Sequence, residues 1–84
     1  MALFIDVHHT AAKDLDAQTM AEVHGRDLAI QDRYGVRFLR YWFDPVTGKA
    51  FCLSEAPSME AVNAVHQHAN GIMADEIFVV YEGQ

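Results

Sequence analysis

"VRFLRYWFDPVTGKAFCLSE" (36–55) is the stretch that decides the fold. Residues 36–43 are β-branched and aromatic, which is typical of a strand. Residues 44–48 supply turn chemistry, and residues 49–55 return as the second arm of a hairpin. The centre of the sequence therefore predicts two antiparallel strands.

The segment before the hairpin predicts a strand and then a helix. Residues 3–9 alternate in polarity with the period of a strand. Asp14 or Asp16 can cap a helix that runs to Tyr34, where Gly35 stops it.

The segment after the hairpin predicts a second helix and a last strand. Pro57 and Ser58 open this helix, and Asn70 with Gly71 ends it. Residues 76–82 form the strand. The order β-α-β-β-α-β is that of a ferredoxin-like α+β sandwich, a four-stranded antiparallel sheet with two helices on one face. Within this sheet we expect the first and third strands to be central neighbours and to run parallel.

Side-chain alternation predicts which residues face the helices. We expect Leu3, Ile5 and Val7 to face them, and Phe4 with its alternate neighbours to face the open side. Pairing the hairpin across its turn turns Ala50 and Cys52 toward the helices. The same pairing places these apolar residues on the open face: Leu39, Tyr41, Phe43, Phe51, Leu53, Phe78 and Val80. A patch of this kind is larger than a monomer normally exposes, so we expect a homodimer packed through the open sheet face.

Composition excludes several classes of protein. The 84 residues allow one small domain, residues 1–84, and a net charge of −6 argues against nucleic-acid binding. No apolar run approaches the roughly 20 residues of a membrane span. The lone cysteine, and an N-terminus without the features of a signal peptide, predict a cytoplasmic protein.

One group of potential metal ligands lies on the predicted helix side. His24 falls within the apolar arc of the first helix, with Asp27 one turn further on. His66 lies on the apolar stripe of the second helix. The rise per residue places the two imidazoles at similar levels, near Cys52. Imidazole and thiolate ligands together suit nickel, copper or zinc.

A second group is expected at the ends of the first and third strands. If these strands run parallel, His8 lies beside Glu55 on the open face, with Asp6 two residues back. Two subunits could share such a site. The ordinary alternative is that a lone buried histidine is a hydrogen-bonded core residue and that His24 simply bonds Asp27 or a neighbouring glutamine.

Five stretches carry a family resemblance: "FIDVH" (4–8), "HGRDLAIQDRYGV" (24–36), "FLRYWFD" (38–44), "FCLSEAPSMEAV" (51–62) and "VHQHANG" (65–71). Together they resemble a small nickel-binding family first catalogued as a domain of unknown function. The resemblance covers nearly the whole chain and implies a ferredoxin-like dimer that binds nickel through histidines. The residues that carry over by motif match are His8, His24, Asp27, Gln31, Cys52, Glu55 and His66.

The sequence departs from the family pattern at one position. The pattern has a further histidine before the glycine that ends the second helix, and this chain has Asn70 there. His68 stands two residues upstream and is expected to point elsewhere.

The favoured function is a dimeric protein that binds nickel, or another divalent transition metal, for sequestration or handling. An alternative is a small dimeric α/β-barrel enzyme, monooxygenase- or isomerase-like, with His24 and Asp27 as an acid–base pair on an apolar substrate. A structural or regulatory ligand-binding module is a third. The candidate metal ligands are His8, His24, Asp27, Cys52, Glu55 and His66.

Overall fold

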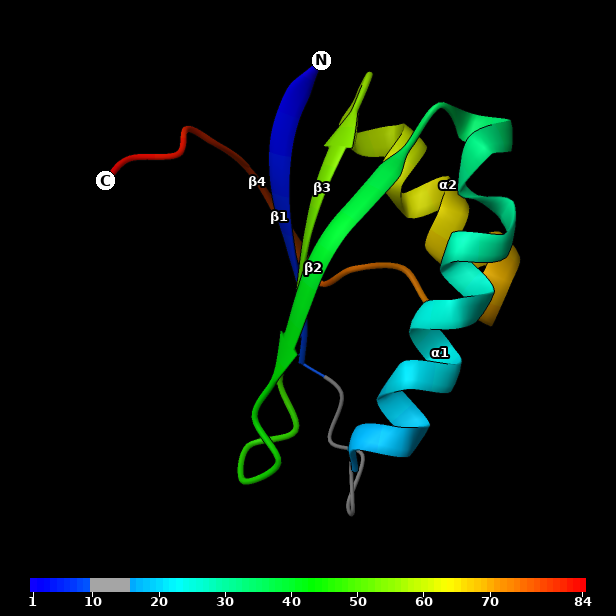
Figure 1. The fold of residues 1–84 in the computed structure, drawn as a ribbon, viewed down its shortest axis with the longest axis vertical. Helices are drawn as coiled ribbons and strands as arrows, with labels where there is room; N and C mark the ends of the chain where they lie inside the picture. Colours follow the sequence, from blue (N-terminus) through cyan, green and yellow to red (C-terminus); the bar gives the residue numbers. More distant parts are fainter. Residues whose placement is uncertain (10–15) are drawn as a thin grey trace.

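Two helices cover one face of a four-stranded sheet and leave the other face uncovered (Figure 1). The computed structural model describes residues 1–9 and 16–84. The elements follow the predicted order and form a ferredoxin-like α+β fold. They are β1 (Ala2–His8), α1 (Ala17–Ile30), a 3₁₀ turn η1 (Gln31–Tyr34), β2 (Arg37–Phe43), β3 (Ala50–Ala56), α2 (Met59–Asn70) and β4 (Glu76–Val80).

The helix ends follow local sequence signals. Asp16 caps α1, because its carboxylate accepts a hydrogen bond of 2.7 Å from the backbone N–H of Thr19. Asp14, the other predicted cap, lies outside the described residues. Ser58 caps α2 in the same way, and Gly71 ends that helix with a φ of 71°.

The sheet order is β2-β3-β1-β4, and every neighbouring pair is antiparallel. The expectation that β1 and β3 run parallel was therefore wrong. The crossover through α1 makes β1 and β2 parallel, and β3 reverses at the hairpin and lies between them. His8 consequently pairs with Ala50, whereas Glu55 pairs with Leu3 at the opposite end of β1.

The two faces of β1 are the reverse of those predicted. Phe4, Asp6 and His8 are buried beneath the helices, and Leu3 with Ile5 lies on the uncovered side. Alternation separates the two sets but does not say which one the helices cover. Here both sets contain apolar residues, so polarity gave no reliable guide.

A register shift between Phe38 and Arg40 reverses the faces of β2. Tyr41 pairs with Cys52, and Phe43 pairs with Ala50, so both aromatic residues lie on the helix side. Their predicted place on the open face was wrong, because the sequence gives no sign of the bulge.

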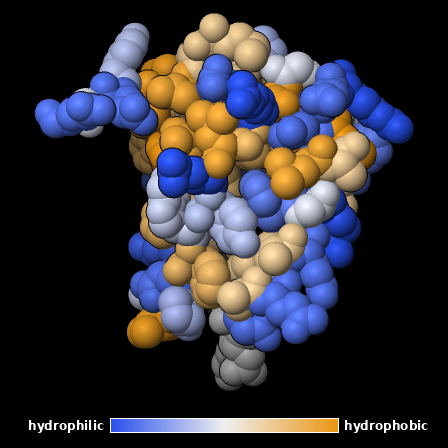
Figure 2. Space-filling model, in the orientation of Figure 1, coloured by the Kyte–Doolittle hydropathy of each residue, from blue (hydrophilic) through white to orange (hydrophobic). Residues whose placement is uncertain are grey.

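The uncovered face remains apolar despite these changes. Ile5 pairs with Leu53 on one side and with Phe78 on the other, which makes a row across three strands. Phe78 is 49% exposed and Trp42 is 48% exposed. Hydrophobic residues gather over the upper half of the strands in Figure 2.

Candidate metal centre

Four buried side chains from three elements meet beneath the helices. Asp6 and His8 come from β1, Cys52 from β3 and His66 from α2. Each offers one potential ligand atom, and these atoms all lie within 4.8 Å of one another. These four residues are called the Asp6 cluster below.

One carboxylate oxygen accepts from both imidazoles of the cluster. The Nε2 of His66 lies 2.6 Å from Oδ2 of Asp6, and the Nε2 of His8 lies 2.9 Å from the same oxygen. The two rings meet edge to face with their centroids 4.7 Å apart. The other oxygen of Asp6, Oδ1, is buried and has no hydrogen-bond partner among the described residues.

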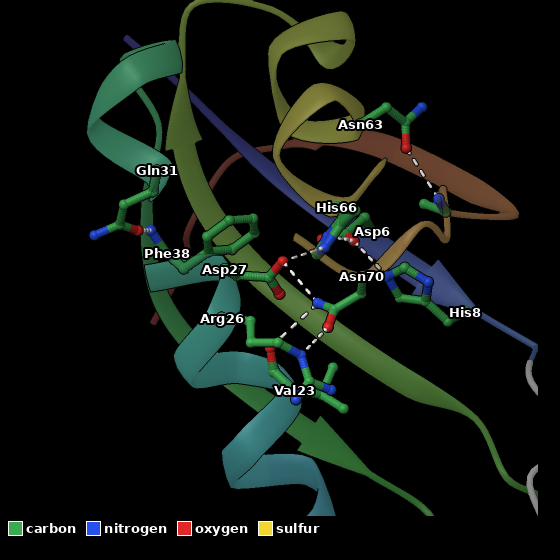
Figure 3. A network of polar contacts seen from close by, with 11 residues as sticks. Asp6, His8, Val23, Arg26, Asp27, Gln31, Phe38, Asn63, His66 and Asn70 are labelled. Carbon is green, nitrogen blue, oxygen red and sulfur yellow. Dashed lines mark hydrogen bonds and ion pairs between the residues drawn. The ribbon is translucent and has the colours of Figure 1, made fainter. Parts of the chain in front are cut away.

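Asp27 positions His66 from the opposite side (Figure 3). The Nδ1 of His66 lies 3.2 Å from Oδ1 of Asp27, which also accepts from the side-chain amide of Asn70 at 3.2 Å. Asn70 in turn donates to the carbonyl of Val23 and accepts from Arg26. This network ties α1 to α2 next to the cluster.

The contacts with Asp6 and Asp27 shift the pKa of each imidazole. Burial lowers the pKa of His66, but its hydrogen bonds to Asp27 and Asp6 outweigh this and raise it to about 12. Burial likewise opposes the bonds of His8 to Asp6 and Cys52, which raise its pKa to about 9. Burial would raise the pKa of Asp6, but the two histidines lower it overall. The raised pKa values favour the protonated form of both imidazoles, so protons would compete with a metal ion for these ring nitrogens.

The donor set of the cluster fits a divalent transition metal. It combines two imidazoles, one thiol and one carboxylate, and imidazole with thiolate suits nickel, copper and zinc. A bound cation would also satisfy the unpaired Oδ1 of Asp6.

A cavity of about 180 Å³ lies beside the cluster, between α1 and the sheet. His8, Cys52 and His66 line it on the cluster side. His24 also lines it, with its ring centroid 4.5 Å from that of Tyr41.

Comparison with known families and solved structures identifies the family of this chain. The model of the family described as nickel responsive protein SCO4226-like matches residues 4–80. The chain belongs to this family. The fold also matches the crystal structure of SCO4226 from Streptomyces coelicolor A3(2), with a TM-score of 0.91 and 40% sequence identity. That match covers 99% of this chain and 100% of the other. No curated protein matched the sequence.

In this member of the SCO4226-like family, the two predicted ligand groups are partly merged. Cys52 and His66 lie together, as the sequence predicted. His8 lies with Cys52 and His66 and not beside Glu55, because Asp6 and His8 face the helices. Asp6 was placed in the second group, two residues before His8 on the same face of the strand, but it was not among the final candidate ligands.

The remaining predicted residues lie outside the Asp6 cluster. Asp27 contacts His66, and Glu55 lies near the far end of β3. His24 is a cavity residue whose buried Nδ1 has no hydrogen-bond partner in the described part of the chain. Burial lowers the pKa of His24, the charge of Asp27 raises it and that of His66 lowers it, with a net decrease.

Gln31, the first residue of η1, satisfies a backbone group of β2. Oε1 of Gln31 accepts a hydrogen bond of 2.9 Å from the N–H of Phe38, next to the register shift in β2.

Among the described residues, no helix is long and apolar enough to cross a membrane.

Proposed function

We propose that this chain binds nickel, or another divalent transition metal, at the Asp6 cluster and serves in sequestering or handling that metal. The observation that carries this proposal is the burial of two imidazoles, a thiol and a carboxylate within 4.8 Å of one another. The family description, nickel responsive, supports nickel among the metals that suit this donor set.

Two further features belong to the same proposal. The apolar uncovered face supports a homodimer packed sheet to sheet, since exposed patches of this kind mark interaction sites. The single cysteine, a free thiol in the cluster, supports a reducing location such as the cytoplasm.

Metal content of protein purified without a histidine tag tests the site. We expect the wild-type chain to bind nickel with a thiolate-to-metal absorption band. Cys52→Ala should lose the band, and His66→Ala should lose most of the metal. His68→Ala is the matched control, because His68 is exposed on the same helix and bonds the hydroxyl of Tyr34. Equal nickel content in all four proteins would contradict the assignment.

The cavity beside His24 favours a second candidate, an enzyme acting on an apolar substrate. In this candidate His24 and Asp27 act as acid and base. The carboxylate of Asp27 is already engaged by His66 and Asn70, which weakens that pairing. A chain that retains no metal after purification, and whose turnover requires His24, would favour the enzyme.

A further inference from the structure

The cavity beside the Asp6 cluster has walls of two kinds. On one side it meets three of the four cluster residues, and Asp6 is the one that does not line it. A molecule in the cavity would therefore lie against three of the four side chains that could hold a metal ion. The rest of the wall comes from the apolar side chains Met20, Val23, Ala50 and Ile72 together with Thr19, His24, Asp27, Tyr41 and Asn70, and the surface that these residues turn toward the cavity is mostly apolar.

The size of the cavity limits its occupant. Its volume of about 180 Å³ compares with apolar cavities of about 150 Å³ that bind benzene. The occupant is thus a molecule of about six to eight non-hydrogen atoms. An apolar body is required, because few polar atoms face the cavity.

Charge limits the polar end of the occupant. Asp6 and Asp27 supply two negative charges at this end, and a metal-bound thiolate of Cys52 supplies a third. A divalent cation balances two of them, and no lysine or arginine is among the cavity-lining residues that the structure describes. An anionic occupant would be repelled by the excess negative charge, so an occupant with an uncharged nitrogen or sulfur donor fits better.

A polar atom of one cavity-lining residue lacks a hydrogen-bond partner among the described residues. Nδ1 of His24 is buried and makes no hydrogen bond with any described residue. Buried polar atoms are normally satisfied, so this nitrogen is available to an occupant or to ordered water.

We propose that the cavity binds a small, uncharged, largely apolar molecule whose single nitrogen or sulfur donor faces the Asp6 cluster. The donor contact rests on the proposed function, because it needs a metal ion in the cluster. The apolar contacts do not, and the experiment separates the two.

The methyl groups of the methionines provide the readout. Met20 is buried and lines the cavity, whereas Met1, Met59 and Met73 are exposed and serve as internal controls. Toluene and 4-methylpyridine are matched probes, since they share size and shape and differ by one ring nitrogen. They are titrated into protein with labelled methionine methyl groups, at a pH at which the pyridine is uncharged.

We expect both probes to shift the Met20 signal of metal-free protein. Nickel should then tighten 4-methylpyridine by at least about tenfold and leave toluene unchanged. Val23→Trp should abolish both shifts, and Ala21→Trp, on the exposed side of the same helix, should preserve them.

Three results would overturn parts of this inference in distinguishable ways. A Met20 signal that neither probe moves more than the control methionines would refute the bound molecule. Nickel binding without tighter 4-methylpyridine would refute the donor contact and leave the metal site standing. Failure to bind nickel would refute the proposed function and the donor contact together, whereas a toluene shift at Met20 would still support the apolar contacts.

Discussion

Asp6 is the residue on which the cluster depends, because both imidazoles meet one of its oxygens. Asp6→Asn keeps the size of the side chain and removes its charge. We expect the pKa values of His8 and His66 to fall and the nickel affinity to drop, since the charge favours both protonated rings and the metal. Titration of the imidazole signals by NMR measures the first effect, with the exposed Asp32→Asn as control. Unchanged imidazole titration would contradict the hydrogen bonds described.

The raised pKa values also predict how pH affects the metal-free protein. A group whose folded-state pKa exceeds its unfolded value stabilises the fold below the unfolded pKa. That stabilisation is lost as pH rises through the folded pKa, which is about 9 for His8. For His8 it amounts to at most about 3 kcal/mol, and the loss continues toward the higher pKa of His66. The melting temperature of metal-free protein should therefore fall between about pH 7 and pH 10. A rising melting temperature over this range would argue against the protonated cluster.

Metal binding should show the opposite dependence on pH. The ligand nitrogens must lose their protons before they bind a metal ion, so nickel binding releases protons. We expect nickel affinity to increase with pH from about 5 to about 8. Calorimetry in buffers of different ionisation enthalpy measures both the affinity and the protons released. Equal affinity across this range would exclude a site built on His8 and His66.

Sequence reasoning located some site residues and misplaced others for identifiable reasons. Cys52 and His66 were expected to lie close together on the helix side, and they do. The apolar stripe of its helix fixes the direction of His66, and alternation along the strand places Cys52 on the same face as Ala50. His8 and Asp6 were placed on the wrong face because both faces of β1 contain apolar residues. Glu55 was placed beside His8 because the direction of β3 relative to β1 depends on topology and not on either strand's own sequence.

At the scale of elements, the order and the ends of helices were predictable, since caps and turn residues act locally. The bulge in β2 was not predictable, although Gln31, just after α1, contacts the strand beside it. The side chain of Gln31 satisfies the N–H of Phe38. The faces on which Tyr41 and Phe43 lie could not be assigned while the register shift in β2 was unknown.

The contact of Gln31 with β2 predicts a loss of stability on substitution. Gln31→Leu removes the acceptor and leaves the N–H of Phe38 without it, at a cost of about 1–3 kcal/mol. Gln31→Glu retains an acceptor oxygen and should cost less. Denaturant unfolding of both variants measures the difference, and equal stability of Gln31→Leu and wild type would refute the role of this bond.

At the scale of the whole molecule, the proposed dimer packs through the uncovered face of the sheet. Leu53 lies near the centre of this face. It pairs with Ile5, and Ile5 pairs on its other side with Phe78. Trp42, the single tryptophan, is 48% exposed and lies on the same face, because it pairs with Phe51 next to Val7. A buried interface here would therefore change the environment of the tryptophan.

Leu53→Asp places a charge at the centre of this face and should convert the proposed dimer to monomers. Desolvating an unpaired carboxylate in an apolar interface is costly, and the net charge of −6 on each chain adds repulsion. Light scattering gives the mass, and a red shift of Trp42 emission reports exposure even where the variant is poorly soluble. Val46→Asp, at a hairpin residue that is 91% exposed, is the control and should retain the wild-type mass. An unchanged mass and unchanged emission for soluble Leu53→Asp would show that the subunits do not meet through this face.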